Sequence, residues 1–147
     1  MRTFIVIAAY NEEKSIASVI KDLHRHGYRD VLVVNDGSRD ETLRLLIEAF
    51  DLRPATRAPT AALPTQPIRG VYRGRDHPNL WVVDKVNGGK ADALNAGLTL
   101  CRTPLFCAID VDTLVERDAL TRISRGFLED AHLVAVGGIV RIVNGST

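Results

Sequence analysis

Apolar residues occur in short uninterrupted runs along the chain. Residues 4–9, 31–34, 80–83 and 105–109 contain no polar side chain. Strands of a parallel sheet are covered on both faces, so they are apolar throughout instead of alternating with polar residues. Each run is therefore predicted to be a buried strand, and the fourth is expected in the centre of the sheet.

Between these runs, apolar residues recur at steps of three and four, which is the spacing of one helical face. Four helices are predicted, with these inward residues: Ile16, Val19, Ile20 and Leu23; Leu43, Leu46, Ile47 and Phe50; Ala91, Leu94 and Leu98; Leu120, Ile123 and Phe127. Gly27 is placed to end the first helix, Asp40 to cap the second and Lys90 to begin the third. Strands alternating with helices predict an α/β fold with a doubly wound, mostly parallel sheet.

Two segments fall outside this alternation. Residues 52–67 contain four prolines among alanine, threonine and arginine, a composition that breaks both periodicities. We expect a long surface loop there. The closing run, residues 133–143, is expected to be extended.

Composition favours one globular domain. The chain has 147 residues, 46% hydrophobic and 25% charged. Its formal net charge of +1 gives no electrostatic reason to expect nucleic acid as a partner. Cys101 and Cys107 suit reduced, half-buried thiols in a cytoplasmic setting. The first apolar run is too short for a signal peptide or a membrane span.

A polar cluster follows each predicted strand. The clusters are residues 10–13, 35–38, 84–90 and 110–112. The carboxyl ends of parallel strands meet at the edge of the sheet where α/β proteins bind ligands. We therefore expect the four clusters to converge on one cleft.

Asp110 and Asp112 are candidate metal ligands. On extended backbone, positions i and i+2 point to the same side, so both carboxylates would face one ligand. Mg²⁺ or Mn²⁺ held by one or two carboxylates completes its shell with water and phosphate oxygens. The pair predicts a cation site for a diphosphate; the alternative is two solvated loop acids.

The other clusters offer groups for a nucleotide. Asp36 is an acceptor for a ring N–H or ribose hydroxyls, or else a turn or capping acid. Tyr10 is a candidate to lie along a base, or else half-buried packing. Gly88-Gly89-Lys90 at a helix start favours an anion, but the spacing is not that of a P-loop.

The remaining basic residues carry less information. The arginines Arg69, Arg73 and Arg75 are expected to form a solvated basic face. The four histidines have no metal-ligand spacing and receive no role.

Together, four segments resemble family 2 glycosyltransferases of the GT-A fold. These are residues 9–13 (AYNEE), 35–42 (NDGSRDET), 88–97 (GGKADALNAG) and 110–112 (DVD). They occur in the family's order over nearly the whole chain. The third looks most like the membrane-embedded processive branch related to cellulose, chitin and poly-N-acetylglucosamine synthases. Two departures are an alanine pair at Ala8-Ala9 where many relatives have proline, and Asn35 in place of the first acid of an Asp-Asp pair.

The resemblance implies inverting transfer of a sugar from a UDP-sugar donor to a saccharide acceptor, with Mn²⁺ or Mg²⁺ as cofactor. Carried over by position, the donor-binding residues are Ala9, Tyr10, Glu12, Asp36, Lys90 and Asp110, and the metal-binding residues are Asp112 and Asp110. Ala9 and Tyr10 would line the base, Asp36 would hold the uracil, and Lys90 would lie near the diphosphate.

Relatives carry a catalytic base, a Gln-x-x-Arg-Trp motif and membrane helices in a region that would follow Thr147. The resemblance therefore implies that residues 1–147 are the N-terminal, nucleotide-sugar-binding part of a truncated GT-A domain. The longer protein is expected at the cytoplasmic face of a membrane. Two alternatives are a non-catalytic nucleotide-binding or scaffolding module and a sugar nucleotidyltransferase. The second normally has a glycine-rich turn directly after the first strand, which this chain lacks.

Overall fold

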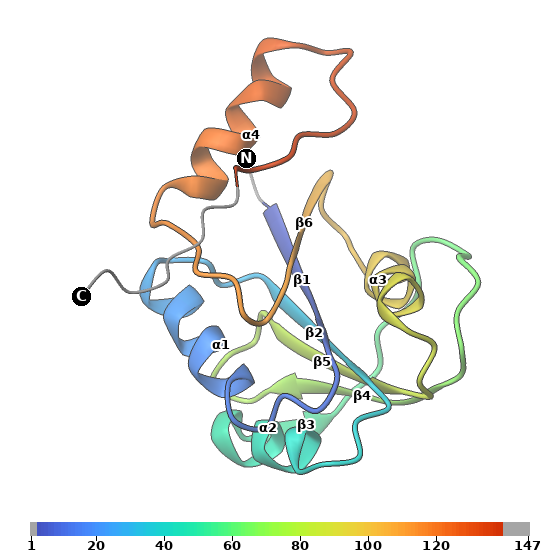
Figure 1. Ribbon diagram of the computed structural model, residues 1–147. Helices are drawn as coiled ribbons and strands as arrows, with labels where there is room; N and C mark the ends of the chain where they lie inside the picture. Colours follow the sequence, from blue (N-terminus) through green and yellow to red (C-terminus); the bar gives the residue numbers. More distant parts are fainter. Residues whose placement is uncertain (1–2, 140–147) are drawn as a thin grey trace. The chain divides into compact units, whose positions relative to one another are not determined.

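The computed structural model describes residues 3–139 (Figure 1). The chain divides into two compact units, one ending at Leu114 and the other beginning at Val115. Among the described residues, the first unit contains a sheet and three helices, and the second contains one helix.

The first unit is built on a six-stranded sheet. Its strands are β1 (Thr3–Ala9), β2 (Val31–Asp36), β3 (Leu52–Pro54), β4 (Ile68–Gly74), β5 (Leu80–Lys85) and β6 (Leu105–Ile109). The order across the sheet is β3-β4-β5-β2-β1-β6. Neighbours from β5 to β6 are parallel, whereas β4 is antiparallel to both β3 and β5. The predicted mostly parallel α/β sheet is confirmed.

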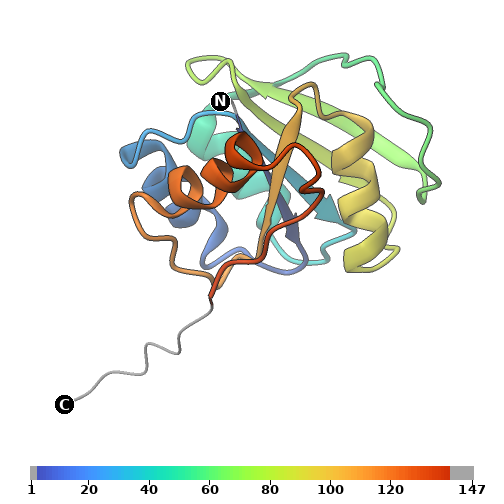
Figure 2. The same cartoon turned by 90° about the horizontal axis from the view of Figure 1, so that it is seen from above.

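Helices cover both faces of this sheet. They are α1 (Ile16–Arg25), α2 (Thr42–Phe50) and α3 (Lys90–Thr99). Figure 2 shows α3 on one side of the strands and α1 with α2 on the other, which confirms the doubly wound arrangement. The apolar strand residues alternate between the two faces. Those facing α3 form a buried cluster with it: Phe4, Val6, Leu32, Val34, Trp81, Val83, Ala93, Ala96 and Leu100.

The expectation of one long loop over residues 52–67 is wrong at its beginning, because Leu52–Pro54 forms β3. Residues 55–67 have no regular structure, but hydrogen bonds tie them to α3 and the turn after it. The backbone N–H of Thr60 donates to the carbonyl of Thr99 at 2.7 Å, and Arg57 Nε donates to the carbonyl of Leu100 at 2.8 Å.

The sequence pattern also missed β4. This strand carries arginines and glycines and is only partly buried, so it lacks the apolar run of a covered parallel strand. Its arginines are not simply a solvated face. Arg73 lies over the Trp81 ring at 5.1 Å from the centroid and donates to the carbonyl of Pro78 at 2.7 Å.

The strand β6 was expected in the centre of the sheet, and this expectation is wrong. Within the described residues β6 pairs only with β1 and lies at the edge. Phe106 is exposed there, and Cys107, like Cys101, is a half-buried free thiol. An apolar run therefore did not distinguish an edge strand from a central one.

The second unit contains α4 (Ala119–Glu129), as predicted. Residues 133–139 form no strand, so the extended run expected over 133–143 is wrong for this part, and residues 140–143 lie outside the described residues. In the part of the chain that the structure describes, no helix is both long and apolar enough to cross a membrane.

Candidate functional site

The turns after β1 and β2 are joined to each other by hydrogen bonds. The backbone N–H of Asn11 donates to Ser38 Oγ at 2.9 Å, and Asn11 Oδ1 accepts from the backbone N–H of Arg39 at 2.8 Å. The backbone N–H of Glu12 donates to Thr42 Oγ1 at 2.9 Å. Two of the four predicted polar clusters therefore lie together, at the carboxyl ends of adjacent strands.

Asp36 connects the cluster after β2 to the cluster after β5. Its side chain is buried, and its Oδ1 accepts from Lys85 Nζ at 2.6 Å and from the backbone N–H of Gly88 at 3.0 Å. Its Oδ2 accepts from the backbone N–H of Gly89 at 2.8 Å. Asn87 Nδ2 donates to the Asp36 carbonyl at 2.8 Å. This aspartate therefore fixes the backbone just before α3.

Lys85 is fully buried beside Asp36. Its ammonium group also donates to the Val86 carbonyl at 2.6 Å and forms an ion pair with Asp92, in the first turn of α3. Burial alone would lower the pKa of Lys85, but its hydrogen bonds and charge attraction with Asp36 and Asp92 outweigh burial and raise the pKa. Lys85 therefore stays charged inside the protein.

A second buried group adjoins the first on the sheet. Asn35 Nδ2 and Arg69 Nη2 both donate to Asp84 Oδ1, at 2.8 Å and 3.0 Å. Arg69 Nε lies 3.0 Å from Asp84 Oδ2, so the guanidinium contacts both carboxylate oxygens. Asn35 Oδ1 is buried without a hydrogen-bond partner. Arg69, whose side chain is 49% exposed, is thus also the partner of a buried carboxylate, which the sequence did not predict.

Lys90 joins the cluster after β5 to the end of β6. Its Nζ lies 2.6 Å from Asp110 Oδ1, and the two side chains are 62% and 55% exposed. As predicted, Lys90 begins α3. A continuous series of contacts therefore runs from Asp36 through Gly89 and Lys90 to Asp110.

The geometry predicted for Asp110 and Asp112 is wrong, because their backbone is not extended. The strand ends at Ile109, and the backbone N–H of Thr113 donates to the Asp110 carbonyl at 3.0 Å in a turn. Within residues 3–139, no group of three or more histidine, cysteine or acidic side chains is placed to hold a metal. Mg²⁺ or Mn²⁺ held by one or two carboxylates takes its other ligands from phosphates and water, so such a site does not require a third acidic side chain.

The remaining candidates lie around the joined turns. Ala9 is buried at the end of β1, and Tyr10 beside it is 47% exposed. Glu12 Oε2 accepts from Ser15 Oγ at 2.7 Å, just before α1. All the candidates therefore lie at, or shortly after, the carboxyl ends of the parallel strands, and their roles toward a nucleotide stay predictions.

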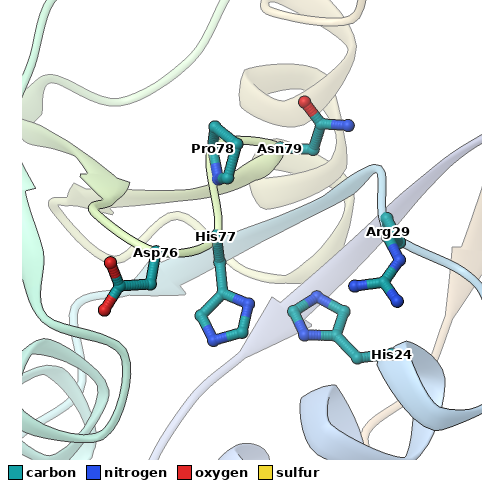
Figure 3. Close-up of a pocket in the computed structure, with 6 residues that line it drawn as sticks. All are labelled: His24, Arg29, Asp76, His77, Pro78 and Asn79. Carbon is teal, nitrogen blue, oxygen red and sulfur yellow. The ribbon is translucent and has the colours of Figure 1, made fainter.

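A small cavity lies at the other end of the strands, away from the candidate residues (Figure 3). It measures about 80 Å³ and is lined by His24, Arg29, Asp76, His77, Pro78 and Asn79. Its residues precede β2 and β5, so they lie at the amino ends of the strands. The rings of His24 and His77 stack with centroids 4.9 Å apart. Burial, followed by the charges of His77 and Arg29, lowers the pKa of His24.

Sequence reasoning did not predict that Asn35, Asp84 and Lys85 are buried, nor that Arg69 and Asp92 pair with them. One signal was present, because Asp84 and Lys85 directly continue an apolar run. The parallel register then places Asn35 beside Asp84 and Asp36 beside Lys85. Charged residues that directly continue an apolar strand thus indicated a buried polar network.

Comparison with known proteins agrees with the motifs. The family model for glycosyl transferase family 2 matches residues 4–58 and 64–147. Poly-beta-1,6-N-acetyl-D-glucosamine synthase of Staphylococcus aureus (strain COL) is 28% identical over 148 residues, covering 99% of this chain and 30% of that protein. The synthase of the same name from Staphylococcus epidermidis (strain ATCC 35984) is 26% identical over 144 residues, covering 97% and 29%. The chain thus spans about 30% of the length of these curated relatives. Because the family model matches nearly all of its residues, the chain belongs to glycosyl transferase family 2.

Proposed function

We propose that this chain is the donor-binding part of an enzyme that transfers a sugar from a UDP-sugar to a hydroxyl of a saccharide acceptor. The observation that carries the proposal is the series of contacts from Asp36 through Gly89 and Lys90 to Asp110. It brings base-binding, phosphate-binding and cation-binding candidates to one edge of the sheet, where α/β proteins bind nucleotides.

The base and ribose are proposed to bind at the joined turns after β1 and β2. Tyr10 offers an exposed ring next to Ala9, and Glu12 lies in the same turn. The Asp36 carboxylate already accepts hydrogen bonds from three donors. A carboxylate has about four acceptor positions, so one is left for a nucleotide N–H.

The diphosphate is proposed to bind through Mn²⁺ or Mg²⁺ at Asp110 and Asp112, with Lys90 near the phosphates. Both aspartates are exposed, and the ion pair of Asp110 with Lys90 is open to solvent and exchangeable. When bound, the cation neutralises charge that develops on the departing nucleoside diphosphate. Lys90 supplies a second positive charge at the start of α3, where backbone N–H groups also favour an anion.

The name shared by both relatives suggests N-acetylglucosamine as the transferred sugar and a growing polysaccharide as the acceptor. The full-length protein is proposed to work at the cytoplasmic face of a membrane, as part of polysaccharide biosynthesis. These proposals are drawn from full-length relatives, of which this chain covers about 30%.

Calorimetric titration of the 147-residue chain tests the proposal. UDP, UDP-N-acetylglucosamine, UDP-glucose and ATP are added with and without Mn²⁺. We expect uridine nucleotides to bind weakly and only with Mn²⁺, and ATP to bind more weakly still. Asp112→Ala should reduce UDP affinity by about tenfold or more, equivalent to about 1.4 kcal/mol.

Asp76→Ala is the matched control, since this exposed carboxylate lies at the opposite edge of the sheet. It should bind UDP as the wild type does. A folded wild-type chain that binds no nucleotide with Mn²⁺, or an Asp112→Ala variant that binds UDP normally, would contradict the proposal.

A further inference from the structure

Lys85 is a buried charged residue with three polar partners inside the protein. An ammonium group has three donors, and Lys85 Nζ contacts Asp36, Asp92 and the Val86 carbonyl. Its side chain has no exposed surface. Because its side chain is fully buried, this lysine does not reach a phosphate at the surface, and its role must be exerted through its partners.

The first partner controls the backbone of the segment before α3. With Oδ1 held by Lys85, the Asp36 carboxylate accepts the backbone N–H groups of both Gly88 and Gly89. Charge-assisted bonds of this kind are stronger than those between neutral groups. They fix the direction in which the chain enters α3 at Lys90.

The second partner lies on the other side of the two glycines. Asp92 belongs to the first turn of α3, and its Oδ1 accepts from the backbone N–H of Gln66 at 2.9 Å. Its hydrogen bond with Lys85 is the main cause that lowers the pKa of Asp92, against the effect of burial. Lys85 therefore connects β2 to the start of α3, across the segment that joins β5 to this helix.

Without the ammonium group, two carboxylates would face each other in a poorly hydrated space. Like charges repel strongly in such a place, and an unpaired buried charge is costly. Asp36 and Asp92 would then move apart or take up protons. Either change weakens the hold of Asp36 on Gly88 and Gly89.

We infer that Lys85 is a positioning residue, which acts through Asp36 and Asp92 to hold residues 88–90 in the conformation that receives the donor diphosphate. The inference rests on the proposed function for its link to the donor. The ordering of residues 88–90 itself rests only on the contacts of the buried network.

Amide hydrogen exchange, followed by NMR, tests the ordering directly. In Lys85→Met, the amides of Gly88 and Gly89 should lose about tenfold more protection against exchange than the amide of Val33. Val33 lies in the buried centre of β2, so exchange of its amide reports opening of the whole fold. Arg69→Met is the matched control, because it also removes a cation from a buried carboxylate but leaves Asp36 untouched. Equal acceleration of all three amides in Lys85→Met would overturn the inference, since Lys85 would then only stabilise the fold.

Asp92→Asn covers the case in which Lys85→Met does not fold. It preserves shape and leaves Lys85 paired with Asp36, so we expect a smaller loss of protection, again confined to Gly88 and Gly89. Unchanged exchange in this variant, together with an unfolded Lys85→Met, would overturn the inference.

UDP titration with Mn²⁺ tests the link to the donor. A folded Lys85→Met variant should bind UDP about tenfold more weakly than the wild type, in proportion to the loss at Gly88 and Gly89. Released glycine amides with unchanged UDP affinity would overturn the link. Failure of the wild type to bind UDP would contradict the proposed function, while the exchange comparison would still decide whether Lys85 orders the segment.

Discussion

Two lysines five positions apart form ion pairs of opposite character. Lys85, Asp36 and Asp92, with the amides of Gly88 and Gly89, form a closed network in which the ammonium group is fully buried. Lys90 and Asp110 form an open pair in which both side chains are more than half exposed. A lysine–aspartate ion pair thus holds the backbone in place at Lys85, whereas at Lys90 it can exchange partners.

Burial produces this difference. A buried ion must keep its partners, because separating them leaves an uncompensated charge in a medium of low polarity. An exposed pair contributes at most about 1 kcal/mol, since water solvates either ion when the other leaves. A binding site benefits from both, because a rigid support orients groups that can still exchange partners.

The largest effect should separate the two lysines by stability. Lys85→Met should lower the free energy of unfolding by about 3–5 kcal/mol, because it strands two carboxylates. Lys90→Met should change it by less than about 1 kcal/mol. Urea unfolding of both variants measures the difference, and equal losses would refute the distinction between a closed network and an open pair.

A smaller effect should appear at two glycines beside the closed network. Gly37 and Gly89 both have positive φ, of 70° and 87°. A Cβ on Gly37 would lie 2.6 Å from the backbone nitrogen of Asn87, whereas a Cβ on Gly89 meets nothing within 4 Å. Gly89→Ala should cost about 1–3 kcal/mol for backbone strain alone, since its ψ of 172° at positive φ is a conformation essentially confined to glycine, and Gly37→Ala should cost more because overpacking is added.

The same unfolding measurements compare these two variants. If Gly89→Ala were as destabilising as Gly37→Ala, the tight contact between the turns after β2 and β5 would not be the cause. Each variant thereby serves as the control for the other.

The smallest effect concerns pH and the opposite edge of the sheet. The lowered pKa of His24 means that the folded state binds fewer protons than the unfolded state near the ordinary histidine pKa of about 6.5. Its contribution is fully present above this value and is lost as pH falls through the lowered pKa. Asp92 and Lys85 should not titrate in this range, because the pKa of Asp92 is lowered and that of Lys85 is raised.

Unfolding free energies measured from pH 7.5 down to about 5 test this assignment. The decrease expected on acidification should be reduced in His24→Gln. His26→Gln, two positions along the same chain segment, is the control and should keep the full decrease. An undiminished decrease in His24→Gln would show that another group is responsible.

Much of the fold could be predicted from the sequence because its signals are local. Uninterrupted apolar runs indicated the four parallel strands, and steps of three and four indicated the helices, including the start of α3 at Lys90. The motifs after each strand were enough to suggest the family. The clusters around Asp36, Lys90 and Asp110 were expected to meet, and the structure joins them.

Other features depend on partners that are distant in the sequence. The strand β4 was missed because its residues are half exposed and become a strand only by pairing with β5. The edge position of β6 is a property of the sheet and not of its apolar run. The turn at Asp110 was also missed, because the prediction that Asp110 and Asp112 point to the same side assumed extended backbone.

The sequence alone determined which charged residues follow the carboxyl ends of the strands, because the periodicities of strands and helices depend on residues close together in the chain. Only the tertiary structure decided which of those charges are buried. Lys85 and Asp36 are 49 positions apart, and the pairing of β2 with β5 brings them into contact. Whether a charge is buried or exposed depends on what packs around it, and for Lys85 that environment is assembled from segments far apart in the chain.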